Sequence, residues 1–158
     1  LIMTAPVRPF ALYAAKFCVV AKMAFLTQGW LLVLFLVGGK LGAGLAGFPP
    51  PEILLWLLRG AVGGLPIIAI QLLLSMVIRN FALPVLMALG GSILGLMATT
   101  SNAGLFWPYS LMLMGMNSNR TEDVMTGQLP GFFLSCIIFL AIFLLIADVV
   151  LAKQDVKA

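Results

Sequence analysis

The stretch of residues 80–119 constrains this chain most, because none of its forty side chains carries a charge. A helix rises about 1.5 Å per residue, so roughly 20 residues cross the apolar core of a bilayer. Forty residues are too many for one crossing. A polar run near the middle of the stretch, Thr99 to Asn102, suits a water-facing boundary. The stretch therefore predicts one crossing over residues 81–98, followed by a segment lying at the outer membrane surface.

Composition extends this conclusion to the whole chain. Hydrophobic residues make up 63% of the sequence and charged residues only 9%, whereas soluble domains carry about 25% charged residues. We predict an all-α integral membrane protein, with four transmembrane helices and short external interfacial or re-entrant helices. It forms a single transmembrane domain over residues 1–158. The other crossings are expected at 17–37, 53–78 and 130–147, with an external segment over 99–129.

Prolines predict where the first two helices begin. Pro6 and Pro9 lack a backbone donor and disfavour helix in the preceding residue, so an interfacial turn is expected to lead into a helix near Phe10. Glu52 follows three prolines, and an acidic residue there complements a helix N-terminus. The chain starts at Leu1 rather than Met and has no signal-peptide pattern. We therefore expect the N-terminus of a longer protein to be missing.

Two polar side chains lie within the predicted crossings. Gln28 is the polar group near mid-depth of the first crossing, where it either bonds to a neighbouring helix or lines a substrate path. Arg59 lies one to two turns into the second crossing. It is expected to snorkel at the outer boundary, and the functional alternative is an anchor for an anionic headgroup or substrate.

The turn at residues 79–80 is so short that the second and third crossings must be antiparallel neighbours. Gly64 then lies at the depth of Gly95, and Gly60 near the end of that helix. Both Gly60–Gly64 and Gly91–Gly95 have the small-xxx-small spacing that lets backbones approach. This pattern predicts a close contact between the two helices in their outer halves. Each helix also holds a proline, Pro66 and Pro84, which can kink it.

The external segment is unusually apolar. Phe106, Trp107 and Tyr109 are expected at headgroup level, where aromatic side chains collect. Pro108 suits the first position of a short helix. The methionine-rich residues that follow, including Met112, are too few to span and predict an outer-surface or re-entrant helix.

Cation placement predicts the topology. With four crossings, both ends of the chain share one side, and the positive-inside rule makes the side with more cations cytoplasmic. Six cations lie on that side and three on the other: Arg8, Lys16, Lys22, Arg79, Lys153 and Lys157 against Lys40, Arg59 and Arg120. Cations scattered over four membrane segments form no nucleic-acid patch, so no nucleic-acid partner is expected.

The chemical inventory argues against an enzyme. The chain has no histidine and no glycine-rich loop ending in Lys-Ser/Thr, so it does not itself hydrolyse ATP. Cys18 and Cys136 lie toward opposite ends of their helices, so neither a disulfide nor a metal site is expected. No acidic residue lies in the middle of a crossing. We therefore expect no catalytic residue, cofactor or metal in this chain.

Three segments carry a family resemblance. Residues 4–8, Thr-Ala-Pro-Val-Arg, with Lys16 after them, are similar to the basic stretch before the third crossing of ABC-2 type exporter permeases. Residues 74–81, Leu-Ser-Met-Val-Ile-Arg-Asn-Phe, are similar to the tight inner turn between the fourth and fifth crossings. Residues 106–110, Phe-Trp-Pro-Tyr-Ser, are similar to the external segment before the last crossing. The pattern most resembles the lantibiotic-immunity and bacitracin-resistance permeases.

The resemblance implies part of a six-helix permease, like a type V exporter, from which the first two crossings and most of the coupling helix are missing. It implies a bacterial cytoplasmic-membrane protein that pairs with a second copy or a sister permease among membrane lipid. A partner ABC ATPase would hold ATP and Mg²⁺. On the cytoplasmic side, Thr4, Pro6, Arg8, Lys16 and Arg79 would lie near that ATPase.

The function implied is ATP-driven export of a cell-wall-active peptide or other amphipathic compound. Phe106, Trp107, Pro108, Tyr109 and Met112 would then face the side to which the compound is expelled. A different class of function is a non-transporting membrane scaffold or assembly subunit held by small-residue helix contacts. An intramembrane enzyme, the third class, would need an external cofactor.

Overall fold

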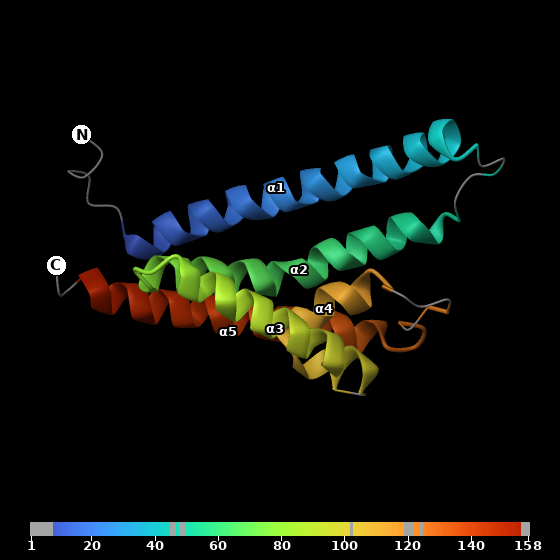
Figure 1. Ribbon diagram of the computed structural model, residues 1–158. Coiled ribbons are helices and arrows are strands. Elements are labelled where there is room, and N and C mark those ends of the chain that lie inside the picture. The colour runs from blue at the N-terminus through green and yellow to red at the C-terminus, as the bar shows by residue number, and fades with distance from the viewer. Residues whose placement is uncertain are drawn as a thin grey trace.

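The computed structural model describes residues 8–44, 47, 50–101, 103–118, 122–123 and 125–155, and within them it contains helices but no strand (Figure 1). Four helices are long and apolar enough to cross a membrane, which confirms the predicted fold class. They are α1 (Pro9–Val37), α2 (Glu52–Val77), α3 (Ala82–Thr100) and α5 (Leu129–Asp155). The shorter elements are a π-helical turn (Gly38–Gly42), a 3₁₀ turn (Gly104–Phe106) and α4 (Pro108–Gly115).

Prolines and one acidic residue mark the starts of three helices. α1 begins at Pro9 and α4 at Pro108, first positions at which the missing N–H would have no helical partner. Glu52 is the first residue of α2, where its carboxylate complements the helix dipole. Pro84 is the third residue of α3, so it takes no hydrogen bond from that helix. The expectation of a kink at Pro84 is therefore wrong, whereas Pro66 does lie inside α2.

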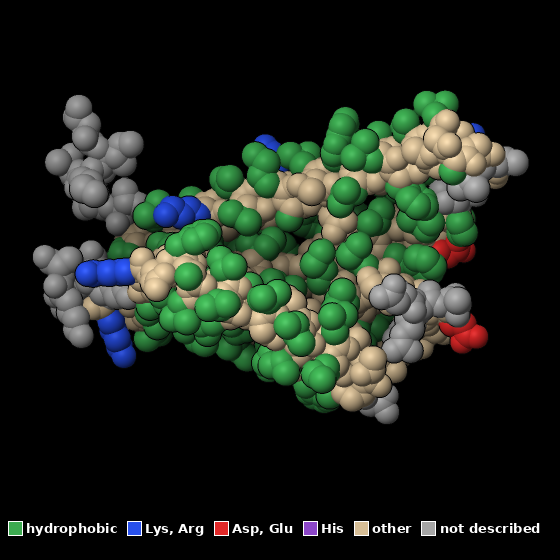
Figure 2. Space-filling view, viewed as in Figure 1, with side chains coloured by type: hydrophobic (Ala, Val, Ile, Leu, Met, Phe, Trp, Pro, Cys, Tyr) green, Lys and Arg blue, Asp and Glu red, His purple; other side chains and the backbone are tan. Residues whose placement is uncertain are grey.

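The bundle has two distinct ends. The start of α1, the turn between α2 and α3 and the end of α5 lie together (Figure 1). Lys and Arg side chains gather there, whereas the acidic side chains on the visible face lie at the opposite end (Figure 2). We call the first the basic end, after Arg8, Lys16, Arg79 and Lys153, and the second the acidic end, after Glu52, Glu122 and Asp123.

A cluster near the basic end fixes the start of α1. Tyr13 is fully buried against Leu73 of α2 and Ala147 and Leu151 of α5. Its hydroxyl donates a hydrogen bond of 2.8 Å to the Ala69 carbonyl. Tyr13 is the one buried residue of α1, and beyond it the helix runs apart from the other helices (Figure 1). α1 is thus held at one end and loosely packed along most of its length.

A short helix, rather than α3, packs against the glycines of α2. A Cβ on Gly63 would lie 2.6 Å from the Leu111 carbonyl oxygen, and a Cβ on Gly115 would lie 2.7 Å from the Arg59 carbonyl carbon. These two glycines therefore let the α2 and α4 backbones meet directly. Gly60 instead faces the Met116 side chain, and Gly64 has only the distant Met112 sulfur nearby.

The glycines of α3 face the same short helix. A Cβ on Gly91 would lie 2.7 Å from the Tyr109 ring, and one on Gly95 would lie 3.0 Å from the Tyr109 backbone. The prediction that the glycine pairs of α2 and α3 meet each other is therefore wrong. The small residues form a groove on each helix, and α4 fills both grooves because it is short and apolar enough to lie between them.

Candidate functional site

The segment from the end of α3 to the end of α4 folds back into the bundle. The chain leaves α3 after Thr100, passes through the 3₁₀ turn and enters α4 beside Gly95, about 7 to 8 Å back along α3. α4 then runs antiparallel to α2, from Leu111 beside Gly63 to Gly115 beside Arg59. Of the two alternatives left open for this helix, the packing favours the re-entrant one.

Aromatic side chains fix the deep end of this re-entrant segment. The Trp107 Nε1–H donates a hydrogen bond of 3.0 Å to the Gly91 carbonyl. Tyr109 is 7% exposed, and its hydroxyl accepts a hydrogen bond of 2.5 Å from Gln71 Nε2. Phe106 is 80% exposed. The expectation that all three aromatic residues lie at headgroup level is therefore wrong for Trp107 and Tyr109, since both find polar partners inside the bundle.

An ion pair fixes the other end of the segment. Arg59 Nη1 lies 3.0 and 2.9 Å from the two carboxylate oxygens of Asp123, in the loop before α5. The side chains are 5% and 27% exposed, respectively. Asp123 Oδ1 also accepts a hydrogen bond of 2.9 Å from the Met125 N–H. Arg59 is thus buried and paired, which makes the snorkelling prediction wrong.

Electrostatics at Asp123 favour its charged form. Burial raises the pKa of the Asp123 carboxyl, but the hydrogen bonds from Met125 and Arg59, the positive charge of Arg59 and the indole N–H of Trp56 outweigh burial and hold this pKa below its ordinary value. A buried guanidinium without a counter-charge is costly, so the pair ties the α4–α5 loop to α2.

A cavity of about 640 Å³ lies toward the acidic end, between α1, α2 and the end of α4. We call it the outer cavity. Its walls are mostly apolar side chains, including four leucines, Phe35 and Trp56. Gln28 lines this cavity and also contacts the residue that follows α4, since its Nε2 lies 4.0 Å from the Met116 sulfur. Gln28 Oε1 is buried without a hydrogen-bond partner, so the cavity offers a free acceptor.

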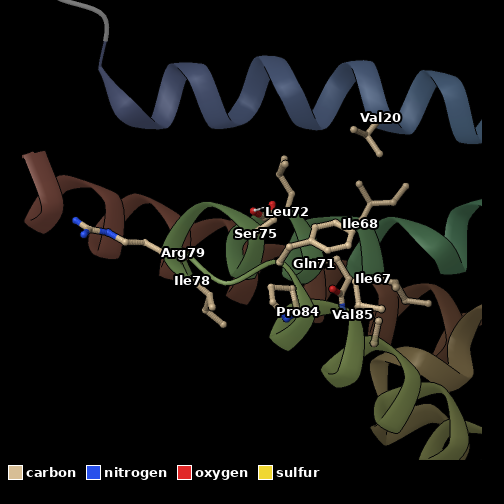
Figure 3. Close-up of a pocket in the computed structure, with 12 residues that line it drawn as sticks. Val20, Ile67, Ile68, Gln71, Leu72, Ser75, Ile78, Arg79, Pro84 and Val85 are labelled. Atoms are coloured by element: carbon tan, nitrogen blue, oxygen red, sulfur yellow. Dashed lines mark hydrogen bonds between the residues drawn. The ribbon is translucent and has the colours of Figure 1, made fainter.

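A second cavity, of about 630 Å³, lies nearer the basic end between α2 and α3, with Val20 of α1 at its edge (Figure 3). We call it the inner cavity. Gln71 lies deep in it, beside the hydrogen bond to Tyr109, and Arg79 lies at the turn that closes the α2–α3 hairpin. No role for Gln71 was predicted from the sequence, although the spacing of Gln71, Ser75 and Arg79 by four residues indicates one polar helix face.

The residues expected near an ATPase are exposed where the structure describes them. Arg8, Lys16 and Arg79 are exposed at the basic end, and Thr4 and Pro6 lie outside the described residues. Cys18 is an exposed thiol of α1 and Cys136 a buried thiol of α5. Among the described residues, no three His, Cys, Asp or Glu side chains come together to hold a metal.

Comparison with family models matches residues 1–95 to the ABC-2 family transporter protein model. The chain belongs to this family. The matched residues cover α1, α2 and α3 as far as Gly95, whereas α4 and α5 follow the match. No curated protein and no solved structure matches the chain.

Membership identifies this ABC-2 chain as a multi-pass permease component of an ABC transporter. Such a component is a membrane transport subunit and not itself an ATPase, and the family in general works with an ABC ATPase. The inner cavity lies wholly within the matched residues, and the outer cavity is completed by Met116 and Asn117, which lie beyond them.

Proposed function

We propose that this ABC-2 permease works in an ATP-driven exporter that expels a cell-wall-active peptide or other amphipathic compound, as in lantibiotic immunity or antibiotic resistance. A partner ATPase binds ATP and Mg²⁺, and a second copy or a sister permease completes the path. The protein lies in the bacterial cytoplasmic membrane with the basic end on the cytoplasmic side. Family membership supports the permease role, and the distribution of charge between the two ends supports the orientation.

The observation that carries the substrate class is the outer cavity. Its apolar walls suit the apolar side chains of an amphipathic compound, and its volume lies within the range of small-molecule sites, about 300–1,000 Å³. A peptide bond offers one N–H and one carbonyl. Gln28 Oε1 can accept a hydrogen bond from the first. The methionine sulfur of Met116 adds an adaptable surface for substrates of varied shape.

The packing of α1 supports a transport motion. Since Tyr13, near the basic end, is the one buried residue of α1, a movement of that end would swing the loosely packed far part of α1 relative to α2. That far part, from Gln28 to Phe35, is one wall of the outer cavity. ATPase closure near Arg8, Lys16 and Arg79, and near Thr4 and Pro6 outside the described residues, would therefore widen or narrow the cavity.

The test begins with affinity purification of the full-length gene product from its own membrane, with co-purifying chains identified by mass. A stoichiometric ATPase that candidate peptides stimulate is the expected result. A clean preparation with membrane partners and no nucleotide-binding chain would overturn the exporter and favour the membrane scaffold.

A pair of variants then tests the outer cavity. Leu57→Trp fills the cavity, whereas Leu58→Trp places the same side chain on the neighbouring, exposed position of α2. Peptide stimulation of the ATPase should fall at least tenfold for the first variant and stay near the wild-type value for the second. Equal responses would remove the outer cavity from the substrate path.

A further inference from the structure

The inner cavity has apolar walls and one polar face along α2. Its apolar lining comes from α2 and α3, with Ile67, Ile68, Leu72 and Val85 among the side chains that Figure 3 shows around the space. The cavity exists because α4 separates the two helices toward the acidic end, while the hairpin turn joins them at the basic end. A pocket of about 630 Å³ is large enough for a small-molecule ligand or part of a lipid.

The polar face of the cavity follows α2 toward the basic end. Gln71, Ser75 and Arg79 are spaced by four residues, and in Figure 3 they succeed one another from the middle of the bundle to its end. The first two already have hydrogen-bond partners within the protein, because Gln71 donates to the Tyr109 hydroxyl and Ser75 donates to the Leu72 carbonyl. A ligand deep in the cavity therefore meets mainly apolar atoms.

Arg79 differs from the other two. It is exposed, its side chain extends away from the cavity toward the basic end, and no described acidic residue pairs with it (Figure 3). Its positive charge thus stands at the mouth of an apolar space, beside the other cations of the basic end. The complementary ligand has an anionic head outside and an apolar chain inside.

We propose that the inner cavity binds one acyl chain of an anionic phospholipid, whose headgroup phosphate is held by Arg79. A phospholipid in the leaflet at the basic end already has its phosphate at the membrane surface and its chains toward the bilayer centre. It therefore needs no reorientation to enter, unlike a peptide. Arg79 supplies charge-assisted hydrogen bonds to the phosphate, and the apolar walls replace the lipid neighbours of the chain.

Lipid retention by the purified full-length protein with its partner chains tests the proposal. The protein is exchanged into detergent with either phosphatidylglycerol or phosphatidylcholine, and bound lipid is counted by native mass spectrometry. Arg79→Gln should weaken phosphatidylglycerol binding about fivefold, the loss expected for one basic side chain at an anionic leaflet (about 1 kcal/mol). It should weaken phosphatidylcholine binding less, because the choline cation offsets the charge of the phosphate. Lys153→Gln removes one charge from the same end outside the cavity and should change neither lipid.

A second pair of variants tests the position of the chain. Val85→Phe fills the cavity from α3, whereas Leu86→Phe adds the same ring at the next position, which does not line the cavity. The first should lower retention of both lipids, and the second should lower neither. Equal losses for Arg79→Gln and Lys153→Gln would mean a diffuse attraction to the basic end and overturn the proposal. Full lipid retention by Val85→Phe would overturn it as well.

Discussion

Replacing Gly63 with alanine tests whether the glycines of α2 pack against α4 or against α3. A Cβ at this position would lie 2.6 Å from the Leu111 carbonyl oxygen, 2.7 Å from the Leu111 carbonyl carbon and 2.9 Å from the Met112 amide nitrogen. Unstrained contacts between carbon atoms are about 3.5–4.0 Å, so the α4 backbone must retreat by roughly 1 Å. Backbone atoms cannot swing away as a flexible side chain does.

The magnitude follows from two opposed effects. Overpacking a tight interface costs about 1–3 kcal/mol, and this case belongs at the upper end because backbone is displaced. Alanine regains about 1 kcal/mol of helix propensity over glycine. We expect Gly63→Ala to lower the free energy of unfolding by about 1–2 kcal/mol. Gly64→Ala meets only the Met112 sulfur, at 3.9 Å, and should be neutral or stabilising by up to about 1 kcal/mol.

The assay is equilibrium unfolding of the purified protein in mixed micelles, with the mole fraction of SDS as denaturant and far-UV circular dichroism as the signal. Gly64→Ala is the matched control, because it changes the same atom on the next residue of the same helix. If α2 instead packed its Gly60–Gly64 pair on α3, the order would reverse and Gly64→Ala would be the destabilising variant. Equal costs for both variants would also refute the packing described above.

Two further predictions concern the polar contacts of the re-entrant segment. Asp123→Asn should lower the free energy of unfolding by about 3 kcal/mol, because it leaves the Arg59 guanidinium buried without its carboxylate, whereas Glu122→Gln on the exposed neighbour should have little effect. Since the pKa of Asp123 is lowered in the folded state, the stability that it contributes is complete above its unfolded pKa of about 3.9. It is lost as the pH falls through the folded value, so unfolding at pH 7 and 5 should agree, and a pH-dependent loss between 7 and 5 would contradict this assignment. Tyr109→Phe should cost about 1 kcal/mol by removing the acceptor for Gln71, and a double-mutant cycle with Gln71→Leu should return a coupling energy of similar size, whereas zero coupling would refute that hydrogen bond.

The helices themselves were largely predictable, because each depends on a continuous run of apolar residues and on nearby residues that end a helix. α2 and α3 begin and end within two residues of the crossings expected at 53–78 and 81–98. α1 begins before the crossing expected at 17–37 and ends with it. α5 begins one residue before the crossing expected at 130–147 and ends after it. Their helices extend beyond these limits because a helix does not stop at a membrane surface unless a proline, glycine or cap stops it.

The site was much less predictable. Arg59 and Asp123 are 64 residues apart, and nothing in either local sequence indicates the other as partner. Gln28 was recognised as a single polar side chain in an apolar helix, but Trp56 and Gln71 were not. Tryptophan is common in apolar helices, so Trp56 did not stand out. Gln71 becomes informative only when it is noticed that it shares one helix face with Ser75 and Arg79.

The sequence by itself determined that four apolar helices of sufficient length exist, that their charges separate toward two ends, and that glycines open grooves on α2 and α3. Only the tertiary structure decided that α4 fills those grooves and that Trp107 and Tyr109 turn inward. The physical reason is that a glycine pair specifies a place where a backbone can approach but not which backbone does so. That choice depends on a competition between α3 and α4 for the same surface of α2, and α4 prevails because Gly63 and Gly115 admit backbone contact on both sides.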